Sequence, residues 1–136
     1  MDAAILDSDI LSELLKRRDA VVLSNASAYL GVHSRFAFSA FVRLEVRRGL
    51  LEKNAVIQLA RFDVFCTHSL IFPVTDVILD RASVLWVDAR RGGLPCGDAD
   101  LIIASTALEN SLVLVTGNNA HFSWIQGLRL VDWRLP

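Results

Sequence analysis

The stretch AAILDSDIL, residues 3–11, decides the fold class of this chain. Its first four residues form a short apolar run, and the next three, Asp7, Ser8 and Asp9, are polar. Beyond them, apolar residues recur at the spacing of a helix, at Ile10, Leu11, Leu14 and Leu15. The stretch therefore predicts a buried strand that leads through an acidic turn into a helix.

The same alternation of strand and helix continues to the end of the chain. Apolar runs predict further strands over residues 35–39, 70–74, 111–116 and 128–131. Helices are predicted over residues 20–31, 40–51, 54–67, 75–91 and 101–110, with a loop at 92–97 and a turn at 117–119. Because apolar strands that alternate with helices form parallel sheets, we predict an α/β fold with a central parallel sheet of four or five strands and helices on both faces.

Composition limits the classes of protein to which the chain belongs. Its 136 residues are enough for one domain with a core, so we predict a single domain over residues 1–136. Hydrophobic residues make up 53% and charged residues 21%, which excludes disorder and favours association with a partner or a second copy. The formal charge of −1 does not by itself indicate a nucleic-acid-binding protein.

The apolar runs and the two cysteines indicate where the protein is located and whether its thiols bind metal. No apolar run approaches the roughly 20 residues that a membrane-spanning helix needs, and the first residues lack the basic flank of a signal peptide. We therefore expect a cytoplasmic protein without membrane contact. Cys66 and Cys96 lack the spacing of zinc ligands, and we expect buried free thiols.

Acidic and small polar residues follow the predicted strands. In open parallel sheets the functional site lies beyond the carboxyl ends of the strands, so these residues are expected to meet there. Glu45 belongs with them because, on its helix, it points away from Arg43 and Arg47 and toward the protein. The residues at the strand ends and at the start of the helix after the loop are Asp7, Ser8, Asp9, Asp98, Asp100, Thr116 and Asn118.

Carboxylates that share one hollow repel one another unless a cation compensates them. Carboxylate and hydroxyl oxygens without a set of Cys or His ligands favour a hard divalent ion, Mg²⁺ or Mn²⁺. Such an ion commonly supports hydrolysis of phosphodiester bonds. The simpler interpretation is that Asp7, Asp9 and Asp98 are helix caps and that Glu45 pairs with Arg48. Capping does not require acids at three separate places of one hollow, which favours the functional interpretation.

Four segments of the chain resemble the motifs of PIN-domain nucleases, in the same order. They are ILDSDILSEL (residues 5–14), FSAFVRLEVRRGL (38–50), DADLIIASTAL (98–108) and LVTGN (114–118). The tail at residues 125–133 is similar to that of VapC-type toxins. This resemblance implies a single PIN-like domain that acts as a ribonuclease toxin of a VapBC-type toxin–antitoxin pair, needs Mg²⁺ or Mn²⁺, cuts RNA and forms a homodimer.

The resemblance also implies roles for individual residues. Asp7, Glu45 and Asp100 match the acids that hold the metal ion, and Asp98 matches an additional acid at or near the metal. Ser8 and Thr116 would orient the metal or its water, and Asn118 would support them. The implied partners are an RNA substrate and a VapB-like antitoxin protein.

One position departs from the PIN pattern. His121 precedes Phe122 where many relatives carry a further acid, so we expect one firm metal site rather than two. Two alternatives remain: a PIN nuclease of RNA processing outside any toxin pair, and a non-catalytic PIN domain that only binds. Setting aside Asp7, Asp9, Glu45, Asp98 and Asp100 leaves ten acidic against 14 basic residues, which makes phosphate contacts plausible elsewhere.

Overall fold

The computed structural model describes residues 1–94 and 96–136. Within these ranges the chain alternates short strands with helices, as the sequence predicts. The elements, in chain order, are β1 (Ala4–Leu6), α1 (Ser8–Lys16), α2 (Ala20–His33), β2 (Ala37–Ser39), α3 (Ala40–Glu52), α4 (Val56–Thr67), β3 (Leu70–Phe72), α5 (Asp76–Arg91), α6 (Asp98–Glu109), β4 (Val113–Val115), α7 (Asn119–Phe122) and β5 (Leu130–Val131).

All strand pairs are parallel, which confirms the predicted α/β class. A three-stranded sheet has the order β1-β4-β5, with Ile5 opposite Leu114, and β2 pairs with β3, with Phe38 opposite Ile71. Since β2 lies beside β1, the strands run in the order β3-β2-β1-β4-β5. This is the order of a doubly wound fold. Successive strands are added to one side of β1 as far as β3, and β4 and β5 are then added to its other side.

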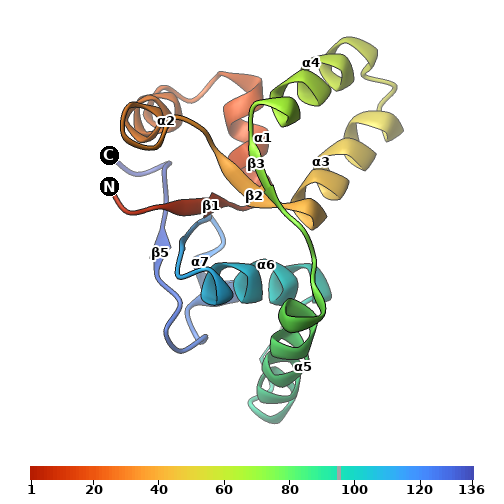
Figure 1. The fold of residues 1–136 in the computed structure, drawn as a ribbon, viewed down its shortest axis with the longest axis vertical. Helices are drawn as coiled ribbons and strands as arrows, with labels where there is room; N and C mark the ends of the chain where they lie inside the picture. The colour runs from red at the N-terminus through yellow and green to blue at the C-terminus, as the bar shows by residue number, and fades with distance from the viewer. Residues whose placement is uncertain (95) are drawn as a thin grey trace.

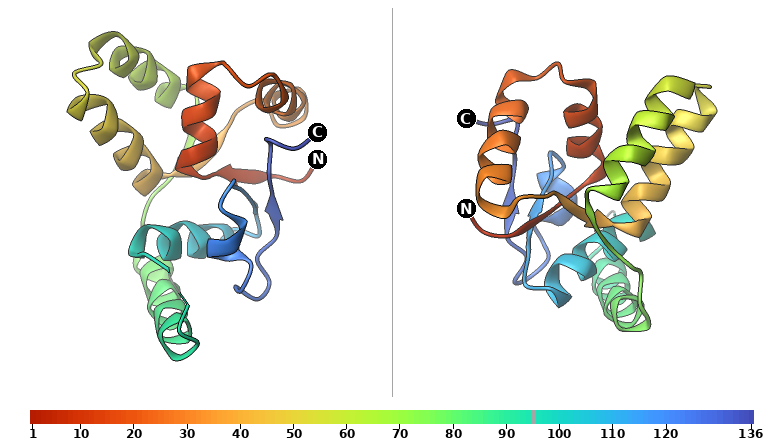
Figure 2. Two further views of the ribbon diagram at one scale, coloured as in Figure 1. Left: turned by 180° about the vertical axis from the view of Figure 1, so that it is seen from behind. Right: turned by 45° about the horizontal axis from the view of Figure 1, so that its top comes forward.

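Helices cover both faces of the strands, as predicted. Figure 1 shows α1, α2, α3 and α4 on one side and α5, α6 and α7 on the other, and the views in Figure 2 agree. Between the two layers the strand residues Ile5, Leu6, Leu114 and Val115 are almost fully buried. This burial holds the carboxyl ends of β1 and β4 side by side.

Tyr29 forms hydrogen bonds to the edge of β1 that faces β2, where the two strands do not pair through their backbones. The hydroxyl group of Tyr29, on α2, accepts a hydrogen bond from the Ala4 N–H at 3.1 Å and donates one to the Ala4 carbonyl at 3.2 Å. The Tyr29 ring stacks on His33 and Phe36 and contacts Trp133. Because buried backbone groups need partners, one side chain satisfies two groups of β1 that no neighbouring strand reaches.

The strands are shorter than the predicted apolar runs, and three further details differ from the sequence predictions. The helix predicted over 101–110 begins at Asp98, because Gly97 takes the extended N-cap position. The turn predicted at 117–119 leads into the one-turn helix α7, which is too short to show helical periodicity. Cys66 and Cys96 are free but only half-buried. Among the described residues, no helix combines the length and apolar character needed to cross a bilayer.

Replacing Tyr29 by phenylalanine should lower the free energy of unfolding by about 1–3 kcal/mol, because the buried N–H and carbonyl of Ala4 lose their partner. Urea unfolding followed by tryptophan fluorescence measures this change. Ser83→Ala removes an exposed hydroxyl group from α5 and should change the free energy by less than about 0.5 kcal/mol. Equal stabilities of the two variants would contradict the role assigned to Tyr29.

Candidate functional site

Asp7 and Thr116 join the carboxyl ends of the two central strands. Asp7 directly follows β1, and Thr116 directly follows β4. The Thr116 hydroxyl donates a hydrogen bond of 2.7 Å to Asp7 Oδ2, and the Ser8 N–H donates one of 2.8 Å to Asp7 Oδ1. This crevice, where the strand order reverses, is the usual position of a ligand site in open α/β sheets.

Asp7 is only 2% exposed, and no cationic side chain is among the groups that shift its pKa. Burial raises the pKa of Asp7 to about 6, while the Thr116 hydroxyl opposes this rise. The neighbouring carboxylate of Asp9 raises the pKa, the Ser8 N–H lowers it, and Asp100 adds a further increase. A buried acid with two acidic neighbours is the environment in which a bound cation would be most stabilising.

Asp9 connects the turn after β1 with the turn after β4. Its Oδ2 accepts a hydrogen bond of 2.9 Å from the Gly117 N–H. In the same turn, the Asn118 N–H donates a hydrogen bond of 3.0 Å to the Thr116 hydroxyl oxygen. Asn118 therefore supports the site through its backbone, while its side chain is exposed.

Arg134 packs against this turn from the C-terminal segment, a contact that no sequence motif indicates. Its Nη2 donates to the Gly117 carbonyl at 2.8 Å, and Asp132 accepts from the same guanidinium group. A Cβ at position 117 would clash with Arg134 Cζ and would lie 2.7 Å from Asp9 Oδ2. Only glycine therefore allows Arg134 and Asp9 to approach the turn this closely.

Glu45 presents an oxygen atom without a partner. It lies in the middle of α3, and its Oε1 is buried with no hydrogen-bond donor among the described residues. Its Oε2 is 4.0 Å from Arg48 Nη2, the weak pair that the simpler interpretation allowed. Burial raises the pKa of Glu45, Arg48 lowers it, Asp100 raises it further, and the Ser8 side chain lowers it. Ser8 therefore acts on Glu45 with its side chain and on Asp7 with its backbone.

Asp100 links the acids electrostatically. It lies in the first turn of α6, and its charge raises the pKa of both Asp7 and Glu45. Asp100 Oδ2 is 3.1 Å from Nδ1 of His121, on α7. The sequence identifies His121 as the residue in place of a further acid, and the structure shows it in contact with one of the remaining acids.

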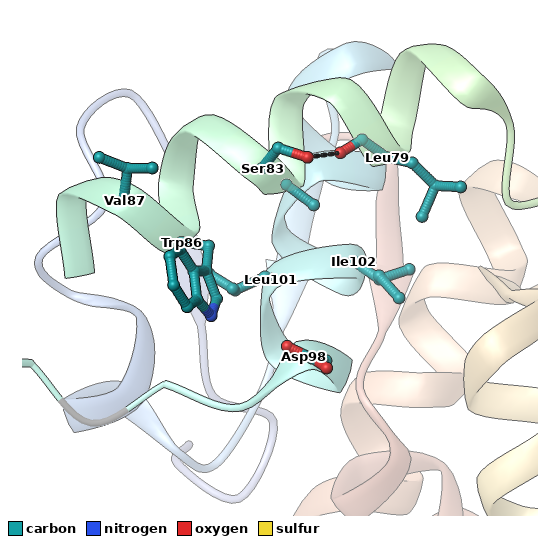
Figure 3. A pocket seen from close by; sticks show the side chains of 8 residues that line it. Leu79, Ser83, Trp86, Val87, Asp98, Leu101 and Ile102 are labelled. Atoms are coloured by element: carbon teal, nitrogen blue, oxygen red, sulfur yellow. Dashed lines mark hydrogen bonds between the residues drawn. The ribbon is translucent and has the colours of Figure 1, made fainter. Parts of the chain in front are cut away.

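Asp98 lies apart from these three acids. Together with Trp86 and Leu101 it lines a groove between α5 and α6 (Figure 3). The volume of this groove is about 430 Å³. Asp98 is exposed, and it is not among the groups that shift the pKa of Asp7 or Glu45. Asp98 and Asp100 are two positions apart, so they point roughly 200° apart around the helix, and only one of them faces the crevice.

The three converging acids fit a hydrated divalent cation. Among the described residues, no three His, Cys, Asp or Glu side chains stand close enough together to enclose an ion on their own. Mg²⁺ does not need such an enclosure, because it keeps several waters and is commonly held by one or two carboxylates. The partnerless Glu45 Oε1, the raised pKa of Asp7 and the electrostatic coupling of Asp100 to both residues are consistent with this mode of binding.

A comparison with known protein families matches the part of the chain that contains these acids. The family model of the PIN domain matches residues 4–126, from the start of β1 to beyond α7. The chain belongs to the PIN-domain family. This PIN domain is also similar to the curated protein Ribonuclease VapC1 of Haemophilus influenzae, strains R2866 and 86-028NP. The identity is 27% over 132 residues, which cover 95% of this chain and 96% of the relative.

Solved structures share the fold of this PIN domain. DNA-bound VapBC from Salmonella typhimurium matches with a TM-score of 0.86 and 24% identity, over 98% of this chain and 99% of that chain. VapBC2 from Rickettsia felis, bound to a DNA fragment from its promoter, matches with a TM-score of 0.85 and 24% identity, over 96% and 98%. The arrangement of strands and helices is therefore that of the chains in these complexes.

Replacing Asp7 by asparagine should change the pH dependence of stability. The raised pKa means that the folded wild type holds a proton that the unfolded chain releases, so its stability falls as the pH rises from about 4 to about 6. An asparagine side chain cannot ionise, so the stability of D7N relative to wild type should increase by about 2–3 kcal/mol between pH 4 and pH 7.

Urea unfolding at both pH values, in the presence of a chelator, measures this difference. Asp80→Asn is the control, because Asp80 is exposed on α5 and forms no ion pair among the described residues. If D7N and wild type differ in free energy of unfolding by the same amount at pH 4 and at pH 7, burial does not raise the pKa of Asp7.

Proposed function

We propose that this PIN domain is a divalent-metal-dependent endoribonuclease and the toxin of a VapBC-type toxin–antitoxin pair. The observation that carries the proposal is the convergence of Asp7, Glu45 and Asp100 on one crevice, with Glu45 Oε1 buried and without a donor. The similarity to proteins named Ribonuclease VapC1, and the fold shared with VapBC complexes, support the substrate and the partner.

In this proposal, Asp7, Glu45 and Asp100 hold the ion, and Asp98 is left out because it faces α5. A bound Mg²⁺ or Mn²⁺ supplies activation of water and stabilisation of the charge on the leaving oxygen. Oxygen ligands without a Cys or His set favour these hard ions. One ion per site is proposed, since His121 stands where a further acid would support a second.

The surrounding residues fix the positions of the acids. Thr116 and the Ser8 N–H hold the two oxygens of Asp7, so that its carboxylate cannot rotate. His121 holds one oxygen of Asp100 and leaves the other for the ion or its water. Because burial keeps a proton on Asp7 up to about pH 6, cation binding should compete with that proton.

Two substitutions test the proposed activity. Asp7→Asn and Asp100→Asn should each reduce the rate of RNA cleavage by at least about 100-fold, because each removes a charge that balances the ion. Cleavage of purified RNA with Mg²⁺ or Mn²⁺ measures the rate, and a chelator should abolish it. Asp80→Asn should cleave like the wild type. Full activity of D7N or D100N, or activity in the chelator, would contradict the proposal.

Metal binding is measured separately by calorimetry. Mn²⁺ should produce heat with the wild type and much less with Asp100→Asn. The absence of metal-dependent heat in the wild type would favour the alternative of a non-catalytic binding domain. Co-expression with a short neighbouring reading frame that encodes an antitoxin should relieve growth arrest. Growth arrest that no neighbouring frame relieves would favour an RNA-processing nuclease instead.

We also propose that the domain forms a homodimer through α5. Four large apolar side chains of α5 are exposed, Val77, Leu79, Val84 and Trp86. Light scattering at micromolar concentration should give twice the mass of 15.0 kDa. Trp86→Glu should give a monomer, whereas Val64→Glu, at an exposed site on α4, should not. A wild type that is monomeric at this concentration would contradict the proposal.

A further inference from the structure

A second groove lies on the other side of the acidic crevice, between α1, α3 and α4. Its volume is about 420 Å³, within the range of roughly 300–1,000 Å³ that is typical of ligand sites. Four basic side chains line it: Lys16 of α1, Arg18 of the following loop, Lys53 at the end of α3 and Arg61 of α4. One acid, Glu45, lines it as well. The groove is therefore strongly positive, although the whole chain carries a formal charge of −1.

The charges of this basic groove are available to a ligand. All four basic side chains are exposed. Among the described residues, Arg18, Lys53 and Arg61 form no ion pair, and Lys16 has only the partly exposed Glu13 carboxylate at 3.7 Å. Surface pairs of this kind contribute little energy, so they do not prevent contact with another anion.

Glu45 connects the basic groove with the acidic crevice. Its carboxylate belongs to the groove lining, and the same carboxylate is electrostatically coupled to Asp100 in the crevice. A polymer with one phosphate at the proposed metal ion would therefore leave the crevice past Glu45 and enter the basic groove. The floor is apolar at Leu15, Val46 and Leu50, and nothing lies within 4 Å of the place where a side chain at Gly49 would begin. The surface beside Gly49 is therefore open.

We propose that this basic groove binds the phosphodiester backbone of the RNA strand on one side of the cleaved bond. The inference rests on the proposed ribonuclease function, because RNA is the polyanion that has to reach Glu45. Lysine and arginine side chains contact phosphates without reading bases. The described lining contains no aromatic residue on which a base could stack. The groove thus increases the affinity for RNA and fixes the direction in which the strand leaves the crevice, without selecting particular bases.

The test is the double substitution K53Q/R61Q, which removes two exposed positive charges without touching the acids. The control R35Q/R91Q removes two exposed positive charges outside the groove. A fluorescently labelled oligouridylate is titrated with each protein in chelator over a series of salt concentrations. K53Q/R61Q should bind roughly tenfold or more weakly at 0.1 M salt, and the slope of log K against log salt should fall by roughly 1.4. The control and the charge-conserving K53R/R61K should bind like the wild type.

Cleavage kinetics give a second measurement. K53Q/R61Q should raise KM about tenfold and leave kcat within about twofold, because the backbone is held equally in the ground state and the transition state. If the wild type neither binds nor cleaves RNA, the proposed function itself fails. If the wild type cleaves RNA and K53Q/R61Q matches R35Q/R91Q in both assays, only the groove assignment fails. If K53Q/R61Q loses affinity for poly-L-glutamate and keeps its affinity for RNA, the groove takes an acidic polypeptide, and the assignment is overturned.

Discussion

The Thr116 hydroxyl donates its hydrogen bond to a carboxylate that is buried at the meeting point of two strands. This bond joins the two strand ends, because Asp7 directly follows β1 and Thr116 directly follows β4. Leu6 and Val115, the last residues of these strands, are almost fully buried, and the Asp7 N–H donates a hydrogen bond to the Val115 carbonyl at 2.9 Å. The buried charge destabilises the folded chain unless a proton or a cation compensates it.

Charge is distributed unevenly over the two sides of Glu45. On one side are the acids of the crevice, Asp7 and Asp100, where the charge of Asp100 raises the pKa of Asp7. On the other side is the basic groove, whose charges suit the phosphates that such a cation would recruit. A single glutamate on α3 separates the two environments. The formal charge of −1 does not reveal this arrangement, because it sums the acidic and basic residues of the whole chain.

Most of the fold could be predicted from the sequence because its strands are short apolar runs and its helices are bounded by clear signals. Asp7, Ser39 and Thr75 cap the helices that follow them. The start of α6 and the helix α7 were not predicted, since neither has a side-chain cap or a full helical period. Of the acids that the sequence singled out, Asp7 accepts a hydrogen bond from Thr116, and both Asp7 and Glu45 are electrostatically coupled to Asp100. The roles of Arg134 and of the pair between His121 and Asp100 have no signal in the sequence, because each joins segments that are far apart along the chain.

The sequence by itself determined the parallel α/β class and the acidic character of the strand ends, because these depend on local apolar patterns and on residue type. Only the tertiary structure decided which acids share the crevice. Asp98 and Asp100 are equivalent in composition, yet the rotation of α6 directs one toward α5 and the other toward Asp7. Likewise, four basic residues that are scattered along the chain form one groove only when α1, α3 and α4 pack together. The direction in which a side chain points and the distance between residues far apart in the sequence are set by the packing of the helices, which no local sequence pattern specifies.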